Sequence, residues 1–429
     1  MRALEPRTAL LLLSLSLGTT TGLAQDGSTQ PSSAEGEQPR QAEERVLGGP
    51  EEVSQNLEDL EEPESIYRFE TLQRWGAPWF DWKARMKADH GLSLGFTYHV
   101  LYQHASDVVS GDSDAWGQIF RFQGDWVALG RGAGSPGRLE WRVEARSDIG
   151  GSLSPSELGG VTGAAALNSG FGYSPDFDLD LAVLNWTQGF NDQTAGLAVG
   201  RLAFDVYLDA FLFQTFSRGF LNRAFLLNPT MATTGIGALG GVAKGFVGDN
   251  VWIGGQIHDA NAVTGEFDLD TVSEGEWLKA VEIGWTPSID RYKTDRIQFT
   301  WWHKDERENA GVPDGQGWAV SASWKLGERL IPFTRFGHSD GGAGVAAENA
   351  ASLGLEYAVR PDQALSLGLG WADPAASGLD DEYVIETSYK LQLSPNFSLM
   401  PDVQVLLDPA SNPTKDQVWV VGVRALLSI

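Results

Sequence analysis

The chain ends in the stretch Gln417–Ile429, QVWVVGVRALLSI. In this stretch the residues at odd-numbered positions differ in polarity from those at even-numbered positions. Successive side chains of a strand point to opposite faces, so a strand here has one continuously apolar face, while its other face carries Gly422, Arg424 and Ser428 among aliphatic residues. In a soluble sheet, a long apolar edge strand of this kind would promote aggregation. In a closed membrane barrel, the apolar face contacts lipid and the other face lines a polar lumen. We therefore predict that this strand closes a transmembrane barrel.

The same alternation of apolar and polar residues recurs upstream. Leu139 and Trp141, for example, alternate with Glu140, Arg142 and Glu144. A period of two predicts strands with two different faces. We expect an all-β fold, a transmembrane antiparallel β-barrel of about 16 strands, because bacterial barrels have even strand numbers. The predicted strands lie near residues 91–103, 115–129, 137–149, 176–188, 194–203, 236–246, 251–259, 276–286, 293–304, 316–325, 330–338, 350–360, 363–372, 382–393, 396–407 and 416–428.

The connections between the predicted strands alternate between long and short. Counted back from the last strand, the long connections all fall on one side of the sheet, which is typical of barrels with short periplasmic turns and longer external loops. This division favours a barrel over a soluble sandwich, whose strands can alternate in the same way. The long connections cover residues 150–175, 204–235, 260–275, 305–315 and 408–415.

The composition narrows the class of protein further. The chain has 429 residues, no cysteine and a formal net charge of −26. The negative charge argues against binding to nucleic acid, which requires a basic surface. After the N-terminal region, no run approaches the roughly 20 apolar residues of a transmembrane helix, which excludes a helical membrane protein.

The N-terminal residues predict export. Arg2 and Arg7 precede the apolar run Ala9–Leu17, and small residues lead up to Ala24, the expected cleavage position. This order is typical of a secretory signal peptide, which we place at residues 1–24. Export of a strand-rich chain indicates the outer membrane of a Gram-negative bacterium.

The next region differs from the rest of the chain in composition. Residues 25–69 are acidic and rich in Glu, Ser, Pro and Gln. Such a segment buries too little apolar surface to fold alone, so we expect a mostly disordered periplasmic tail, with one short helix around Leu57 and Leu60 as its only candidate element. The barrel domain is then expected over residues 70–429.

Patterns typical of catalysis or metal binding are sparse. There is no cysteine nucleophile and no H-E-x-x-H motif, and the six histidines are scattered without the spacing of metal ligands. The acidic stretches Asp107–Asp114 and Glu266–Glu276 lack the ligand order of a calcium loop, so we interpret them as solvated loops. We expect no enzyme, no cofactor and no metal site.

One long connection, Phe204–Thr230, is too aromatic to be an ordinary solvated loop. We expect it to fold into the barrel and narrow it, which would bury the aromatic rings and present Arg218 and Arg223 to the channel. An external loop packed on its neighbours is the alternative. The rings that need burial are Phe211, Phe213, Phe216, Phe220 and Phe225.

Several segments together resemble the carbohydrate-selective porins of the OprB type, over about residues 70–429. The resemblance is carried by WFDWKARMKADHGLSLGFTYHV (Trp79–Val100), LAVGRLAFDVYLDAFLF (Leu197–Phe213), FLNRAFLLNP (Phe220–Pro229), IPFTRFGHSDG (Ile331–Gly341), LMPDVQVLLDPASNP (Leu399–Pro413) and the closing strand. It implies a barrel of about 16 strands that passes monosaccharides or related small sugars and is constricted by inward loops.

Sugar selection without chemistry requires polar side chains that replace water on the solute's hydroxyl groups, and binding weak enough for release. For each candidate the alternative is an ion pair that only holds the barrel in shape. Parity and the resemblance together nominate Arg201, Asp205, Asp209, Arg218, Arg223 and Arg335 as pore-lining residues. Parity alone adds Arg121, Arg142, Glu144, Asp402 and Gln404.

The leading functional hypothesis is therefore an outer-membrane porin for passive diffusion of small carbohydrates such as glucose. The net charge suggests a second hypothesis, a general or cation-leaning porin without sugar selectivity. A barrel enzyme such as a lipase or protease would need an acid–base cluster at the rim, and a secreted soluble β-protein would partition into buffer without detergent. The expected partners are small sugars and outer-membrane lipid, with no nucleic acid, and the sequence is compatible with a homo-oligomer.

Overall fold

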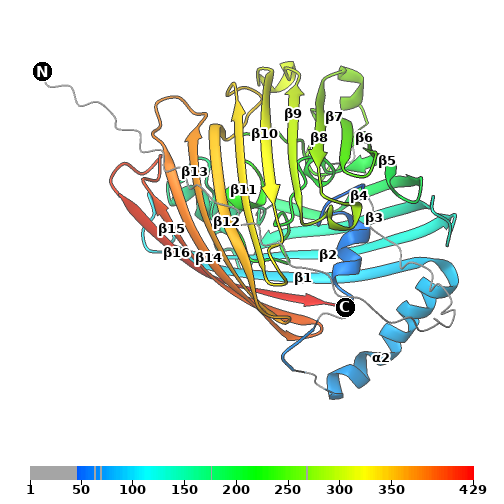
Figure 1. Ribbon diagram of the computed structural model, residues 1–429. Helices are drawn as coiled ribbons and strands as arrows, with labels where there is room; N and C mark the ends of the chain where they lie inside the picture. Colours follow the sequence, from blue (N-terminus) through cyan, green and yellow to red (C-terminus); the bar gives the residue numbers. More distant parts are fainter. Residues whose placement is uncertain (1–45, 62–63, 68–69, 175, 267–268) are drawn as a thin grey trace, which may run out of the picture. The chain divides into compact units, whose positions relative to one another are not determined.

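Sixteen antiparallel strands close into one barrel in the computed structural model of the chain, which describes residues 46–61, 64–67, 70–174, 176–266 and 269–429 (Figure 1). Each strand pairs with its neighbours in sequence, and the first pairs with the last. This confirms the predicted fold class. The strands are β1 (Leu92–Ala105), β2 (Asp114–Leu129), β3 (Gly137–Asp148), β4 (Asp176–Phe190), β5 (Ala195–Leu202), β6 (Ala238–Val247), β7 (Val251–Asp259), β8 (Trp277–Trp285), β9 (Arg296–Lys304), β10 (Gly315–Ser323), β11 (Leu330–Ser339), β12 (Ala347–Arg360), β13 (Gln363–Pro374), β14 (Glu382–Ser394), β15 (Phe397–Leu407) and β16 (Gln417–Ser428).

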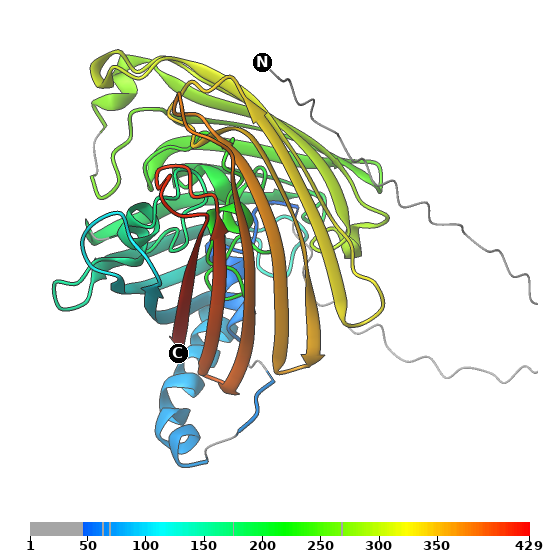
Figure 2. The same cartoon turned by 90° about the vertical axis from the view of Figure 1, so that its left-hand side faces the viewer.

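The closing strand β16 has the two faces that its sequence predicts. It lies between β15 and β1, with Leu101 opposite Arg424, and Figure 2 shows the C-terminal strands β12–β16 side by side in orange and red. Trp419 and Val421 on the apolar parity are 46% and 42% exposed, whereas Arg424 on the other parity is fully buried inside the barrel. The outward face is therefore the apolar one, as lipid contact requires.

The long and short connections separate to opposite ends of the barrel, as predicted. Every connection from an odd-numbered strand to the next leaves at one end, and these include the two longest, at residues 149–174 and 203–237. The connections at the other end are mostly short turns, such as Asn191–Thr194 and Pro395–Asn396. Exposed tryptophans lie on the outer surface toward both ends, for example Trp116 and Trp126 at the two ends of β2.

The helical segments are short apart from α2. Among the described residues, no helix combines the length and the apolar character needed to cross a membrane. Figure 1 shows α2 at the end of the barrel where the C-terminus lies. The ring nitrogen of Trp126 donates to the carbonyl of His90, in the segment that follows α2, over 3.2 Å. These segments are α1 (Val53–Asp59), α2 (Glu70–Arg85), η1 (Met86–His90), α3 (Pro155–Val161), η2 (Phe204–Val206), α4 (Arg223–Leu226), η3 (Thr271–Glu274), η4 (Ile289–Arg291) and η5 (Glu308–Ala310).

Residues 46–61 differ from the disordered tail predicted for residues 25–69. They include α1, and Val53 and Leu57 are buried against the inner wall at β1–β4. A segment of this composition does not fold alone, but here the barrel supplies its apolar and charged partners. Residues 1–45, with the predicted signal peptide, lie outside the described residues.

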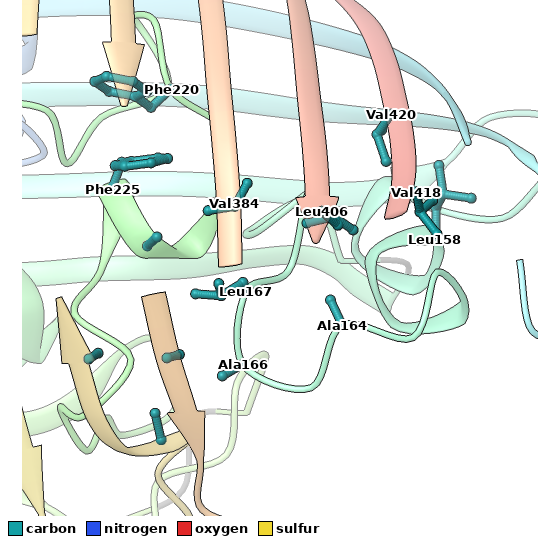
Figure 3. Packing of buried hydrophobic residues seen from close by; sticks show 14 of the residues in the cluster. Leu158, Ala164, Ala166, Leu167, Phe220, Phe225, Val384, Leu406, Val418 and Val420 are labelled. Carbon is teal, nitrogen blue, oxygen red and sulfur yellow. The ribbon is translucent and has the colours of Figure 1, made fainter. Parts of the chain in front are cut away.

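The core of the molecule lies inside the barrel, where two long loops pack on the inward side chains of the strands. Leu158, Ala164 and Leu167 from the connection after β3 meet apolar side chains of the strand wall. Figure 3 shows this packing beside Phe220 and Phe225, which come from the connection after β5. The wall side chains labelled there are Val384, Leu406, Val418 and Val420.

Candidate functional site

The β5–β6 loop (residues 203–237) folds into the bore and is anchored there by aromatic packing. Phe211, Phe213, Phe220 and Phe225 are almost fully buried, and the ring of each lies 4.8–6.2 Å from that of Phe333 on β11. These are the separations and tilted or edge-on arrangements that aromatic rings prefer. The predicted inward fold of this loop is what the structure has, and the external-loop alternative is wrong.

A buried ion pair joins the same loop to the wall. Arg335 of β11 donates from Nη2 to Oδ2 of Asp209 over 2.6 Å, and its guanidinium lies 4.6 Å from the ring centre of Phe211. Ser321 of β10 donates to the other carboxylate oxygen over 3.2 Å. Burial raises the pKa of Asp209, which Arg335 only partly offsets.

Charged wall residues also hold the backbone of the loop. Glu386 of β14 accepts hydrogen bonds from the amides of Leu221 and Asn222, over 2.6 and 3.0 Å. Arg424 of β16 donates to the carbonyls of Arg218, Gly219 and Phe220. A loop whose backbone groups are bonded this way keeps a defined position in the bore.

One wall carboxylate binds a turn of the β3–β4 loop (residues 149–174). Glu382 of β14 accepts from three successive amides, Ala165, Ala166 and Leu167, over 2.9, 2.6 and 2.6 Å. Before this turn, Ser154 and Glu157 form a reciprocal capping box at the start of α3. Two loops therefore narrow the bore from the long-loop end.

Arg218 on the β5–β6 loop is the least buried of the nominated residues in ion pairs. Its side chain is 32% exposed, and its Nη1 lies 3.7 Å from Oε1 of Glu356 on β12. The guanidinium also lies 5.7 Å from the ring centre of Phe213. A cation, a carboxylate and an aromatic ring thus meet at a partly open position inside the barrel.

The structure brings some of the predicted site residues together. Arg121 of β2 pairs with Glu144 of β3 over 2.7 Å, and Arg142 of β3 donates to Gln123 over 2.9 Å. Asp402 and Gln404 bond to one another on β15, and Asn222 of the β5–β6 loop donates to Gln404. Both groups are buried on the inward face.

Other predicted residues stand apart. Arg201 pairs with Asp180 of β4 over 2.5 Å, and Asp205 accepts from Gln214 within its own loop over 2.8 Å. Arg223 lies over the ring of Phe171, and burial lowers its pKa to about 10, so it remains charged at neutral pH. All eleven nominated residues come from inward strand positions or from the β5–β6 loop. Their role as pore lining stays a prediction.

Several inward charged groups that position the loops are absent from the nominated set. They share the inward parity with the nominated residues, so parity identifies them as lumen residues but does not show which of them contact a loop. They are Lys244, Glu282, Glu382, Glu386, Lys390 and Arg424.

Among the described residues, no three His, Asp or Glu side chains converge as metal ligands. A G-x-S-x-G spacing does occur at Gly91–Gly95, but Ser93 lies in β1 and not at the strand-to-helix turn of a catalytic serine.

Comparison with known proteins adds to this geometry. Residues 314–428 match the family described as carbohydrate-selective porin, OprB family. The family resemblance predicted from the sequence is confirmed. The OprB of Pseudomonas putida, in its high-pH structure, has a similar fold, with a TM-score of 0.61 at 15% identity, covering 82% of this chain and 97% of that one.

Two curated relatives are also porins. Porin AaxA of Chlamydia felis is 26% identical over 263 residues, and Porin AaxA of Chlamydia abortus is 26% identical over 265 residues. Each match covers 58% of this chain and 57% of the relative, so the chain spans less than two thirds of the length of these relatives. The matching family and both relatives are described as porins, and the fold is similar to that of a solved porin.

Proposed function

We propose that this chain is a porin of the bacterial outer membrane that lets small carbohydrates, such as glucose, diffuse passively through its loop-narrowed polar bore. Export by the predicted signal peptide and the apolar outer face of the barrel are consistent with that location. The family description of the matching segment supports the carbohydrate class.

The observation that carries the proposal is the group formed by Arg218, Glu356 and Phe213. The Arg218 side chain is 32% exposed, although its Nη1 atom is itself buried and makes no hydrogen bond among the described residues. Oε1 of Glu356 lies 3.7 Å from that atom, so a partly exposed cation and a carboxylate stand side by side. A sugar presents neighbouring hydroxyl groups that can bond to both, and its apolar ring face suits the phenyl ring. Such contacts replace hydration without the tight binding that would prevent release.

Several charged side chains inside the barrel form ion pairs, which favours a neutral solute. Arg335 is paired with Asp209, and Lys244 of β6 with Glu282 of β8 over 2.8 Å. Paired charges provide many hydrogen-bonding groups and little net field, so neither cations nor anions are strongly attracted. The net charge of −26 instead favours the second candidate, a general or cation-leaning porin, if the field of the whole chain dominates in the bore.

Three solutes of nearly equal size distinguish these candidates: glucose, the cation glucosamine and the anion gluconate. Folded protein is reconstituted in liposomes, and the uptake of each solute is compared with protein-free liposomes. We expect glucose to enter fastest. Glucosamine entering fastest would favour the cation-leaning porin, and no uptake of glucose above the protein-free control would reject the proposed function.

A further inference from the structure

Residues 46–61, here called the plug segment, cross the bore near the short-turn end of the barrel. At one side, the amide of Val46 donates to the carbonyl of Gln193 in the β4–β5 turn over 3.2 Å. The Val46 side chain is 1% exposed and packs with Trp252 of β7 and with Tyr292 before β9. The segment therefore begins against the β7–β9 side of the wall.

The same segment reaches a distant sector of the wall. Glu51 pairs with Arg121 of β2 over 2.7 Å, and Arg142 of β3 donates to its backbone carbonyl over 2.8 Å. Gln123 donates to Asn56 over 2.6 Å. Gln55 also accepts a hydrogen bond from Lys293 in the β8–β9 connection. The contacts of the plug segment therefore extend from β1–β3 round to the β8–β9 connection in the closed strand order.

The end of the plug segment occupies a socket made by a glycine. Leu57 packs beside Val183 of β4, and an ideal Cβ placed on Gly95 of β1 would lie 2.4 Å from Cδ2 of Leu57. Toward the β5–β6 loop, an ideal Cβ on Gly49 would lie 2.7 Å from Cβ of Ala210. The plug segment thus lies directly against the loop that narrows the bore.

The plug segment is bound to the barrel wall in a way that permits its release. Helix α1 has seven residues, no side-chain cap at its N-terminus and no basic residue in its last turn, and so short a helix is not stable alone in water. The wall arginines also keep partners of their own, since Arg121 bonds to Glu144 and Arg142 bonds to Gln123. Departure of the segment would therefore not leave these wall charges without partners, which lowers the cost of release.

We infer that residues 46–61 form a displaceable plug, and that the conducting state of the barrel is the one in which this segment has left its sockets on β1–β3. The inference rests on the proposed channel function and adds a gate to it. It also predicts a change of selectivity. Arg121, Arg142 and Arg146 share Glu144 and the carboxylate of Glu51, so release of the plug takes the Glu51 carboxylate away from these arginines. The released segment carries five acidic residues and no Lys or Arg.

A disulfide between the plug and the wall tests the inference in the full chain. The chain has no cysteine, so the double variant Leu57→Cys with Gly95→Cys can form only one intramolecular disulfide. Folded protein is inserted into planar bilayers, and the ionic current is recorded after oxidation and again after reduction. The single variants Leu57→Cys and Gly95→Cys, treated identically, are the matched controls.

We expect a several-fold lower current in the oxidised double variant, recovery on reduction, and no response in the single variants. Equal currents before and after reduction, with the disulfide verified by mass spectrometry, would overturn the inference. So would failure of the two cysteines to cross-link in the folded barrel, or absence of current in the reduced state. Ionic current that follows the redox state without sugar uptake would instead count against the proposed sugar function alone.

Removing the charge of Glu51, which pairs with Arg121 of the wall, provides a second, independent measurement. Glu51→Gln removes the negative charge while keeping the size of the side chain, so we expect more frequent opening and a reversal potential shifted toward anions. Glu328→Gln, which changes an exposed carboxylate in the β10–β11 turn, is the matched control for the loss of one charge. Identical opening and selectivity in Glu51→Gln and wild-type protein would contradict a plug held by this residue.

Discussion

Arg335 of β11 and Asp209 of the β5–β6 loop form an ion pair 2.6 Å long that is almost completely buried, with side-chain exposures of 1% and 3%. It is a direct electrostatic link between the wall and the loop folded inside it. Asp209 has a positive φ of 51°, a conformation that Asn also tolerates. Asp209→Asn therefore removes the charge without adding backbone strain.

We predict that Asp209→Asn destabilises the barrel by about 3–5 kcal/mol, because it leaves the Arg335 guanidinium buried without its counter-charge. The measurement is reversible urea unfolding in detergent, within a double-mutant cycle with Arg335→Gln. The two single losses should not add in the double variant. Additive losses would mean that the two residues do not interact.

Glu382 offers a prediction for the β3–β4 loop. Each hydrogen bond to a charged group contributes about 1.5–3 kcal/mol, and Glu382 accepts three from successive amides. Glu382→Ala should therefore free this loop locally and speed hydrogen exchange at Ala165, Ala166 and Leu167. Asp381→Asn, one residue earlier and bonded to Trp371 near the outer surface, is the control and should leave these amides unchanged. Unaltered exchange in Glu382→Ala would show that the loop is held elsewhere.

Glu51 predicts the response of the plug segment to acid. Burial alone would raise its pKa, but Arg121 and Arg142 reverse this effect and leave it below the ordinary value of 4.5. A lowered pKa in the docked state means that the stabilisation is fully present above pH 4.5 and is lost as the pH falls through the lowered value.

The current should accordingly rise on acidification below about pH 4.5, and in Glu51→Gln this rise should be absent. Single-channel recording from pH 7 downward measures both. The groups that face Glu51 are Arg121, Arg142 and Glu144 of the wall and Thr215 and Asp205 of the β5–β6 loop. The same rise in the variant would assign the acid response to one of these groups.

The outer face of β16 tests the contact with lipid. Val421 is 42% exposed on the apolar parity, and Leu427 lies on the same face near the short-turn end. Val421→Arg should cost about 2–4 kcal/mol of folding free energy in a bilayer, and Leu427→Arg about 0–1, because the penalty for a charge falls toward the interface. Folding titrations in lipid vesicles compare the two. Equal, small losses would mean that this face is not in the membrane.

Sequence parity was sufficient for the strands because each has two chemically different faces. Trp141 faces outward and Arg142 inward, as their alternation predicts, and the same holds for Trp419 and Arg424. Arg201 also faces inward, but strict alternation along β5 does not explain why. Gly200, with a φ of 140°, interrupts the alternation of β5, so that Ala198 and Arg201 are both buried although they lie an odd number of positions apart.

The inward fold of the β5–β6 loop was also predictable, because its phenylalanines need burial that only the bore supplies. Its anchors were not. Glu386 and Arg424 have the same parity as other lumen residues, and their bonds to residues 218–222 depend on how far the loop reaches across the barrel. Likewise the acidic composition around Glu51 concealed a segment that finds its partners on distant strands.

The central claim is a bore that binds sugar weakly at Arg218 and Glu356, and the most direct test is single-channel current titrated with a panel of sugars. The account predicts block that rises with sugar concentration, and a weaker block in Arg218→Ala than in wild type or in Arg329→Ala, an exposed control at the β10–β11 turn. Current that no sugar reduces, or equal block in all three proteins, would contradict it.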